Sequence, residues 1–337
     1  MDRRTFLRYL AAIGVGTVVS GVAGKLARKL DEELYEMKQS KYMLGTVVTI
    51  SAMSPDPEIA RRAVDSAFRE IDRLEGMLSR YRKGGQVYTL NEKGFLDNAS
   101  QELVWVLEKA RYYSEISDGA FDVTVKPLLD LYTRCFWEER RTPTDDEIER
   151  ALRLVDYKKI AVYRNEVWLE EEGMGITLDG IAKGFIVDRA VEVQKRNGVE
   201  HGFVNAGGDL RVIGGKGAGN PWRIGIKSPE NEREYLGVIE LREGSVATSG
   251  NYEIFFNEEK TYHHIVNPRL GRSPVKCVSV TVTAEKAVDA DALSTAVFVL
   301  NPERGLELVE GMNGVEALII TRDGTRVTTS RFRYIDL

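Results

Sequence analysis

The chain has 337 residues, a formal net charge of -5 and 43% hydrophobic residues. The hydrophobic content is ample for a buried core, and the acidic balance excludes nucleic acid as the main partner, since nucleic acids attract basic surfaces. With only two cysteines and no C-x-x-C spacing, the chain also lacks the pattern of a soft-metal site or a redox dithiol.

The first 24 residues form a segment of their own. A basic start with Arg3 and Arg4 precedes an apolar stretch from about Leu10 to Val22, which is typical of a twin-arginine export signal. The stretch is short and glycine-rich for a membrane span; an uncleaved anchor and an ordinary amphipathic helix are the alternatives. We therefore expect an exported, extracytoplasmic protein on the periplasmic or cell-surface side, with a signal or membrane anchor at its N-terminus.

The rest of the chain divides into a charged linker, residues 25–39, and a single domain, residues 40–337. Apolar periodicity and capping patterns predict the elements of its first half. They are a strand at 46–50, a helix from Pro57 to about Tyr81, a helix from Ser100 to about Ser117, a short helix with a capping box at Thr144, a hairpin at 159–172 and a helix from Ala182 to Asn197.

The second half is rich in predicted strands. They are 202–206, 223–227, 236–241, 245–249, 252–256, 278–284 and a hairpin at 316–332 that turns at Asp323-Gly324. Helices are expected from about Asp289 and from about Pro302. Because helices and strands do not alternate regularly, the pattern indicates an α+β fold with a mostly antiparallel sheet and packed helices.

Asp291 and Thr295 stand four residues apart in a mostly apolar helix, so both side chains lie on one face. Such a pair also occurs on solvated helix faces, but apolar neighbours favour a buried carboxylate, which needs a partner or a metal. Two oxygen donors suit a hard cation such as Mg²⁺. His263 and His264, two of the three histidines, come shortly before this helix. The segment is typical of a metal-assisted active site.

Other runs suit a phosphate-bearing ligand, although each has a plain structural explanation. Lys183 lies at the start of a helix, where backbone N–H groups attract phosphate. Small residues around Phe121 allow close approach of a ligand, but a helix C-cap and a core ring explain them equally well. The glycine-containing turns at 205–209 and 248–250 are explained by turn formation alone. No G-x-G-x-x-G follows a strand, which argues against an ordinary Rossmann flavoprotein.

In combination and in this order, these runs resemble the ApbE family of FAD:protein FMN transferases. The matching runs are MLGTVVTI from Met43, LSRY ending at Tyr81, SDGAFDVTVKPLL from Ser117, LDGIAKGFIVD from Leu178, VNAGGDLRVIG from Val204, VATSGNY from Val246, HHIVNP from His263 and DADALSTA from Asp289. They cover roughly residues 40 to 300, and together they are specific although each is weak alone. The resemblance implies an ApbE-like, two-lobed single domain.

The resemblance also implies the roles of individual residues. Mg²⁺ would be held by Asp291, Thr295 and the Gly180 carbonyl, with Ser294 as a weaker candidate. His264 would be the general base, and Lys183 would assist at the FAD pyrophosphate. FAD would be contacted by Met43, Tyr81, Ala120, Phe121, Asp122, Thr177, Asp179, Lys183, Gly207, Gly208, Thr248, Ser249, Gly250 and Ile265.

The chain departs from the family pattern at one run. Relatives commonly read D-L-G-G-I-A-K-G around the lysine, whereas this chain has Thr177 in place of the acidic residue and carries Asp179 two positions later. The resemblance therefore does not decide between Thr177 and Asp179 as the counterpart of that acid.

The expected reaction is the Mg²⁺-dependent transfer of FMN from FAD to a threonine hydroxyl of an acceptor flavoprotein, with release of AMP. A subunit of an ion-pumping redox complex is one candidate for the acceptor. Two alternatives are an FAD pyrophosphatase, which would use water as acceptor, and a non-catalytic FAD carrier. The same metal site would serve both acceptors, while the presence of His264 and Asp291 argues against a carrier.

Overall fold

The structure is a computed structural model that describes residues 26–31, 34–217, 219–231 and 233–337. Its centre is a nine-stranded sheet in which all neighbouring strands are antiparallel. In spatial order the strands are β1 (Leu26–Asp31), β2 (Leu34–Met43), β3 (Thr46–Ser54), β7 (His201–Ala206), β8 (Asp209–Ile213), β11 (Gly244–Gly250), β12 (Cys277–Ala284), β13 (Glu316–Thr321) and β14 (Arg326–Thr328).

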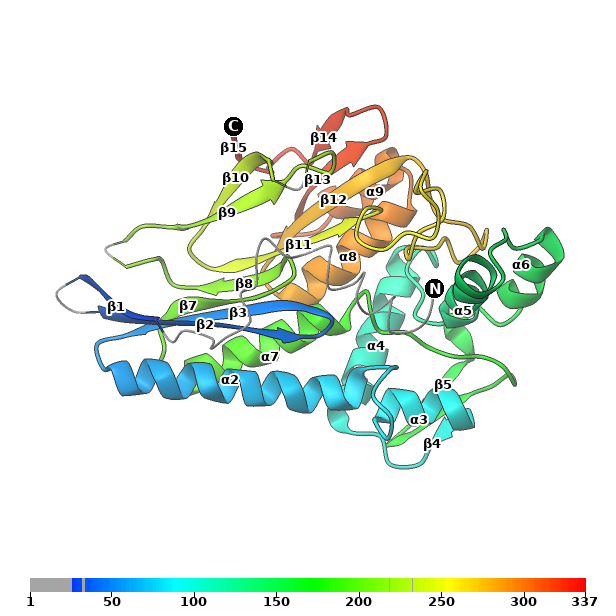
Figure 1. The fold of residues 1–337 in the computed structure, drawn as a ribbon, viewed down its shortest axis with the longest axis horizontal. Coiled ribbons are helices and arrows are strands. Elements are labelled where there is room, and N and C mark those ends of the chain that lie inside the picture. The colour runs from blue at the N-terminus through cyan, green and yellow to red at the C-terminus, as the bar shows by residue number, and fades with distance from the viewer. Residues whose placement is uncertain (1–25, 32–33, 218, 232) are drawn as a thin grey trace.

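Helices cover one face of this sheet and a small sheet covers part of the other (Figure 1). The covering helices are α2 (Pro57–Leu78), α7 (Ala182–Arg196) and α8 (Ala287–Val299). The small sheet consists of β15 (Ile335–Asp336), β10 (Tyr235–Leu241) and β9 (Trp222–Lys227). Ile226 and Ile239 of the small sheet pack with Val246 and Leu318 of the large one. The predicted α+β class with a mostly antiparallel sheet is confirmed.

The remaining helices gather mainly at one end of the large sheet and form a second lobe (Figure 1). They are α3 (Gln86–Lys93), α4 (Gln101–Ile116), α5 (Lys126–Tyr132), the π-helical turn η1 (Thr133–Glu138), α6 (Asp145–Leu152) and the 3₁₀ turn η2 (Tyr157–Lys159). This lobe also holds a sheet of β4 (Phe95–Leu96), β6 (Glu166–Leu169) and β5 (Ile160–Tyr163). Helix α9 (Pro302–Glu310) packs against α8 and β13.

Helix α2 forms where its apolar period predicts it. Asp56 caps its first turn by accepting a hydrogen bond from the Glu58 N–H at 2.8 Å. Apolar residues at helical spacing face the sheet and are fully or nearly fully buried: Ala60, Ala63, Val64, Ala67, Phe68, Ile71, Leu74 and Leu78. The helix ends at Leu78, slightly earlier than expected, because Ser79 adopts an extended backbone. Tyr81 therefore lies on the connection after the helix.

Most of the charged stretch at 25–39, expected as a linker, lies in the strands β1 and β2. Residues 34–43 form β2, which pairs with β3 along its whole length. Charged side chains are compatible with this strand because their long stems cover apolar rings. The Lys41 ammonium lies 4.3 Å from the centre of the Phe68 ring, and that of Lys38 lies 5.5 Å from the Phe203 ring.

One predicted strand is wrong. Residues 252–256 do not form a strand; their single bridge joins Phe255 to His263. Phe256 instead packs its ring against Phe136 and Trp137, at centroid distances of 5.9 and 4.9 Å. The run from Ser117 connects two helices, α4 and α5.

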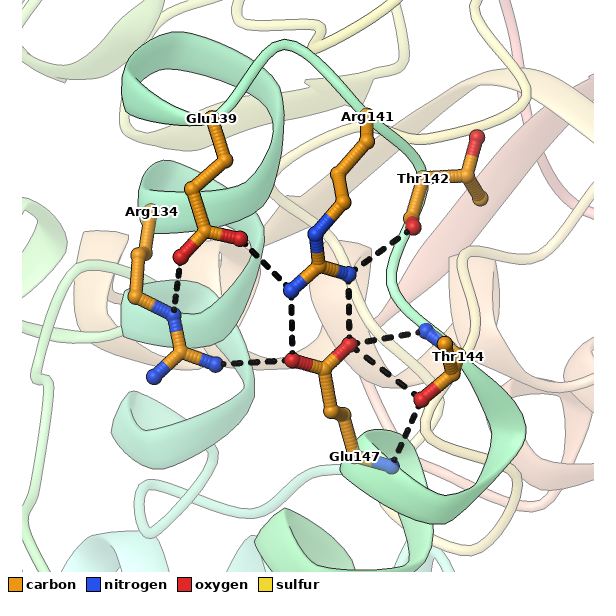
Figure 2. A network of polar contacts seen from close by, with 6 residues as sticks. All are labelled: Arg134, Glu139, Arg141, Thr142, Thr144 and Glu147. Atoms are coloured by element: carbon orange, nitrogen blue, oxygen red, sulfur yellow. Dashed lines mark hydrogen bonds and ion pairs between the residues drawn. The ribbon is translucent and has the colours of Figure 1, made fainter.

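An ion-pair network fixes α6 against η1 in the second lobe (Figure 2). The predicted capping box at Thr144 is present, with the Glu147 side chain accepting from the Thr144 N–H at 2.9 Å. Arg141 donates to both Glu147 carboxylate oxygens, at 2.6 and 2.7 Å, and Arg134 adds a contact at 3.1 Å. These pairs hold the pKa of the Glu147 carboxyl well below its ordinary value.

The expected signal or anchor, residues 1–24, lies outside the described residues. Within the part of the chain that the structure describes, no helix combines the length and the apolar character needed to cross a membrane. Cys135 and Cys277 are both buried free thiols.

Candidate active site

The core of the site is the contact between α7 and α8, which depends on a glycine. A Cβ atom at Gly184 would lie 2.3 Å from the Ala287 carbonyl oxygen and 2.8 Å from the Asp291 Cβ. Without a side chain there, the helices approach closely, and the Gly184 N–H donates to Asp291 Oδ2 at 2.9 Å. Asp291 is thus held from the first turn of α7, the turn that also carries Lys183.

The start of α8 is capped by a residue of α7. Lys286, the residue before the helix, gives no side-chain cap. Asp188 caps the helix instead, because it accepts hydrogen bonds from the otherwise unpaired N–H groups of Ala287 and Val288, both at 3.0 Å. Arg211 of β8 pairs with Asp188 at 2.8 Å. These buried contacts set the position of α8, and with it the positions of Asp291 and Thr295.

Lys183 forms a charge cluster with two buried carboxylates, Asp209 and Asp291, and its own side chain remains partly exposed. The Lys183 ammonium lies 2.7 Å from Asp209 Oδ2. Burial alone would lower the pKa of Lys183, but Asp209 and Asp291 outweigh this and raise it. Burial and the nearby Asp209 raise the pKa of Asp291 well above its ordinary value. Two carboxylates share one ammonium group, so the ionised cluster has an excess negative charge that favours a further cation.

The hydroxyls of Ser294 and Thr295, one turn after Asp291 on α8, lie beside Ser249 and the backbone at Gly180. The Ser249 hydroxyl is 2.8 Å from the Ser294 hydroxyl and 3.3 Å from that of Thr295. A Cβ atom at Gly180 would lie 3.0 Å from Thr295 Oγ1, so the backbone at Gly180 packs directly on Thr295. Ser294 donates its proton to the Asp291 carbonyl oxygen at 2.9 Å, which turns its hydroxyl back toward its own helix.

The two adjacent histidines have different environments. His263 is fully buried, 5.6 Å from Phe298 between ring centroids, and its Nε2 lies 3.0 Å from the Pro274 carbonyl oxygen. His264 is partly exposed, and its Nδ1 lies 3.1 Å from the Ile254 carbonyl oxygen. A carbonyl only accepts, so Nδ1 of His264 carries the proton and Nε2 keeps a free lone pair. Burial lowers the pKa of both rings, that of His263 to about 4.

The 117–124 run places an aromatic wall beside Gly180. Phe121 is nearly buried, packs edge-on against Tyr113, and would lie 3.3 Å from a Cβ atom at Gly180. Ala120 beside it is also buried. Asp122 braces the loop: Oδ1 accepts from the N–H and hydroxyl of Thr124, and Oδ2 from the Tyr157 N–H. Burial raises the pKa of Asp122 to about 6.

Thr177 and Asp179 have opposite environments. Thr177 is buried, and its N–H donates to the Val123 carbonyl oxygen at 2.7 Å. Asp179 is half-exposed and lies 3.3 Å from Nε of Arg80, next to the exposed Tyr81. The acidic side chain of this run therefore faces an arginine. Met43 lies at the end of β2, partly buried against the core.

The remaining residues that were expected to contact FAD lie mostly at strand ends and turns. Gly207 has a positive φ of 65°, and a Cβ atom there would lie 2.5 Å from Thr46 Oγ1, so the turn requires glycine. Gly208 donates its N–H to the Asn205 side chain at 2.9 Å. Within the sheet, the Thr248 hydroxyl bonds the Thr281 hydroxyl at 2.9 Å, and Gly250 packs on Tyr252. Ile265, outside the sheet, is buried.

Sequence reasoning missed two charged residues of this region, Asp209 and Arg80. Both stand inside runs that it singled out, VNAGGD and LSRY, but only the folded chain shows their partners. A second group of ligand types, Cys135, Glu139 and Glu147, has its ligand atoms within 4.8 Å of one another. Arg134 and Arg141 already pair with both of its carboxylates (Figure 2).

Comparisons with known proteins identify the family of this chain. The sequence model of the ApbE family matches residues 44–319. An FAD:protein FMN transferase of Vibrio cholerae is 32% identical over 75% of this chain and 78% of its own length. One of Treponema pallidum is 29% identical over 86% of this chain and 85% of its own length.

Solved structures show the same fold. The ApbE protein of Thermotoga maritima superposes with a TM-score of 0.80 and 33% identity, covering 88% of this chain and 97% of its own. The flavin transferase ApbE of Vibrio cholerae gives a TM-score of 0.75 at 26% identity, covering 91% of this chain and 99% of its own. The chain belongs to the ApbE family and is a transferase.

Proposed function

We propose that this chain transfers FMN from FAD to a threonine hydroxyl of an acceptor flavoprotein, in a Mg²⁺-dependent reaction that releases AMP. The observation that carries the proposal is the cluster of Asp209, Asp291 and Lys183, with the Ser249 and Thr295 hydroxyls on α8's side of it and the partly exposed His264 ring within electrostatic reach of Lys183. The relatives named FAD:protein FMN transferases support the choice of FAD as donor and a protein as acceptor.

The donor set fits Mg²⁺. Asp291 uses Oδ2 to accept from Gly184, and Oδ1 accepts no hydrogen bond from the described residues. Together with the Thr295 hydroxyl and the Gly180 carbonyl, this carboxylate offers the hard oxygen ligands that Mg²⁺ prefers. When bound, Mg²⁺ would offset the negative charge of Asp209 and Asp291 and that of a pyrophosphate. Ser294 is a weaker ligand because its proton is donated to the Asp291 carbonyl.

His264 would accept the proton of the incoming hydroxyl. Its Nδ1–H is donated to Ile254, so Nε2 is the basic nitrogen, and the lowered pKa keeps it unprotonated near neutral pH. The acceptor oxygen forms a bond to the phosphorus of the FMN half of FAD. The bond from that phosphorus to the bridging oxygen breaks, and AMP leaves with that oxygen.

Lys183 would hold the pyrophosphate at the start of α7. It is fixed by Asp209 at 2.7 Å, so its ammonium group is already oriented before substrate binds. Phosphoryl transfer needs alignment and charge neutralisation more than covalent help from the protein, and a fixed ammonium group supplies both.

Mass spectrometry of the acceptor tests this proposal against its alternatives. The chain is incubated with FAD, Mg²⁺ and a candidate acceptor, such as a flavin-bearing subunit of an ion-pumping redox complex. Transfer predicts one FMN on a threonine and one AMP for each acceptor modified. Release of free FMN and AMP without a modified acceptor would indicate a pyrophosphatase, and intact FAD would indicate a carrier.

We also propose that the chain acts outside the cytoplasm after twin-arginine export. The support is Arg3-Arg4 before the apolar stretch in the first 24 residues. Replacing both arginines by lysine should leave the protein in the cytoplasmic fraction. Undiminished export of that variant would contradict the route.

A further inference from the structure

Arg80 links three segments around the expected flavin pocket. Its guanidinium lies 3.3 Å from Asp179 beside Gly180 and 3.8 Å from Asp130 of α5. It also donates to the hydroxyl of Tyr81, on the connection after α2. The Arg80 side chain is only 12% exposed. Asp179 and Asp130 compensate the charge of this nearly buried cation, although Nε donates no hydrogen bond to the described residues, and the hydrogen bond to Tyr81 orients the guanidinium.

Tyr81 has the opposite exposure. The residue is 62% exposed, although an aromatic ring of this size is usually covered. The Arg80 guanidinium carbon lies 4.6 Å from the centre of the ring. Arg80 is nearly buried while the ring beside it is not, so one side of the ring is fixed by a cation–π contact and an open side remains. A fixed ring with an open side is suited to stacking on a planar heteroaromatic group.

The contact between Arg80 and Asp179 gives a role to the acidic residue that this chain carries two positions later than the family pattern. Asp179 is directed to Arg80, whereas Thr177 is buried and bonded to Val123. The Asp179 carboxylate therefore contacts Arg80, which in turn contacts Tyr81. Removing it would take away one of the two carboxylates that compensate the buried guanidinium.

We propose that Arg80 is a positioning residue that presents Tyr81 as the stacking platform for the isoalloxazine ring of FAD, with Asp179 as the carboxylate that holds Arg80 in place. This inference rests on the proposed function, because it takes FAD as the substrate. It adds a residue that acts through Tyr81 and has no part in the phosphoryl transfer itself.

Binding of flavin fragments tests the proposal without acceptor, metal or turnover. A tyrosine stacked on isoalloxazine quenches flavin fluorescence, so titrations with FMN give both affinity and quenching. Arg80→Met keeps the length of the side chain but removes the planar cation. It should weaken FMN binding roughly fivefold to thirtyfold and reduce the quenching at saturation. Tyr81→Leu should abolish the quenching, and Tyr81→Phe should keep most of it.

Arg82→Met is the matched control. Arg82 lies two residues away, is half-exposed and pairs with Asp72 and Glu75 of α2. Its loss should change neither affinity nor quenching. Thermal unfolding of each variant separates a local effect from loss of the fold; should Arg80→Met unfold, Asp179→Asn serves in its place, with a smaller loss in the same direction.

Two further probes identify the group that stacks. Riboflavin lacks the phosphate and AMP lacks the flavin. Arg80→Met should weaken riboflavin and FMN by the same factor and leave AMP unchanged. A loss confined to FMN would mean a phosphate contact, and a loss confined to AMP would mean adenine stacking; either result would overturn the proposal. So would equal FMN binding by Arg80→Met and Arg82→Met. Wild-type protein that binds flavin but never transfers it would refute the proposed function alone.

Discussion

The proposed site combines two regions that are stabilised by different contacts. One is the α7–α8 wall, the contact surface that carries Lys183 and Asp291, and the other is the loop at 251–274, which carries His264. On the wall, Asp291 and Lys183 are fixed by buried partners from two helices and a strand. On the loop, His264 is held by the Ile254 carbonyl, and aromatic packing of Phe256 on η1 fixes the loop from outside. The positions of Lys183 and Asp291 thus depend on core packing, whereas the position of the proposed base, His264, depends on a loop. Substitutions on the wall should affect stability and chemistry together, and those on the loop mainly chemistry.

Asp291→Ala should have the largest effect. It removes the only carboxylate assigned to Mg²⁺ and leaves Lys183 with one partner, so transfer should fall at least about a thousandfold. The assay is FMN attachment at limiting and saturating Mg²⁺. Asp289→Asn is the control, since Asp289 on the same helix contacts Tyr113 and Lys109 instead. Native rates for Asp291→Ala at limiting Mg²⁺ would show that the cation binds elsewhere.

His264→Ala should come next, with a loss of about a hundredfold to a thousandfold in transfer and little change in FAD affinity. A general base must be unprotonated, and burial lowers the pKa of His264 below 6.5. The wild-type rate should therefore be constant at neutral pH and fall only as the pH drops through that lowered pKa. His263→Gln should keep the native pH profile. A larger loss for His263→Gln than for His264→Ala would reverse the assignment.

Asp209→Asn should lower transfer by about tenfold to a hundredfold, since it acts through Lys183. The amide keeps the shape of the side chain but not the charge that orients the ammonium group. The kcat for FMN transfer and the KM for FAD should both change, because Lys183 would meet the substrate in a less fixed position. Unchanged kinetics would mean that the ion pair of Lys183 and Asp209 serves only the fold.

The smallest effect on transfer is expected at His263, where the readout is stability. The folded pKa of about 4 lies below the ordinary 6.5, so the unfolded chain binds a proton that the folded chain excludes between these values. The contribution of His263 to the free energy of unfolding is therefore fully present above pH 6.5 and falls by about 3 kcal/mol toward pH 4. His263→Gln keeps a donor for Pro274 and should flatten this part of the unfolding curve. An unchanged slope would assign the acid sensitivity to another group.

The sequence predicts the long elements well and the connections poorly. Helix α2 and strand β12 follow from periodicity because burial on one or two faces dictates their residues. The 252–256 segment has the composition of a strand, yet its rings find partners in η1, a contact between distant segments that local pattern does not encode. The charged composition of β2 conceals a strand for a similar reason, since its lysine stems cover rings of α2 and β7.

The same limit applies to the site. The Asp291 and Thr295 pair is visible as a spacing within one helix. The partners Asp209 and Arg80 are not, because each comes from another element and its role follows from what it touches. The environments of Thr177 and Asp179 are not visible in the sequence for the same reason, since the partners of these residues, Val123 and Arg80, come from other segments.

The cap that Asp188 supplies to α8 has a consequence for how the protein folds. The capped N–H groups lie 99 and 100 residues further along the chain than the carboxylate that receives them. Helix α8 can begin at Ala287 with satisfied N–H groups only after this distant part of the chain has docked. Asp291 therefore reaches its ligand geometry late, when α7 and α8 are already packed. A partly synthesised or partly folded chain would present neither the cation site nor the pyrophosphate site, so capture of Mg²⁺ and FAD is confined to the finished domain.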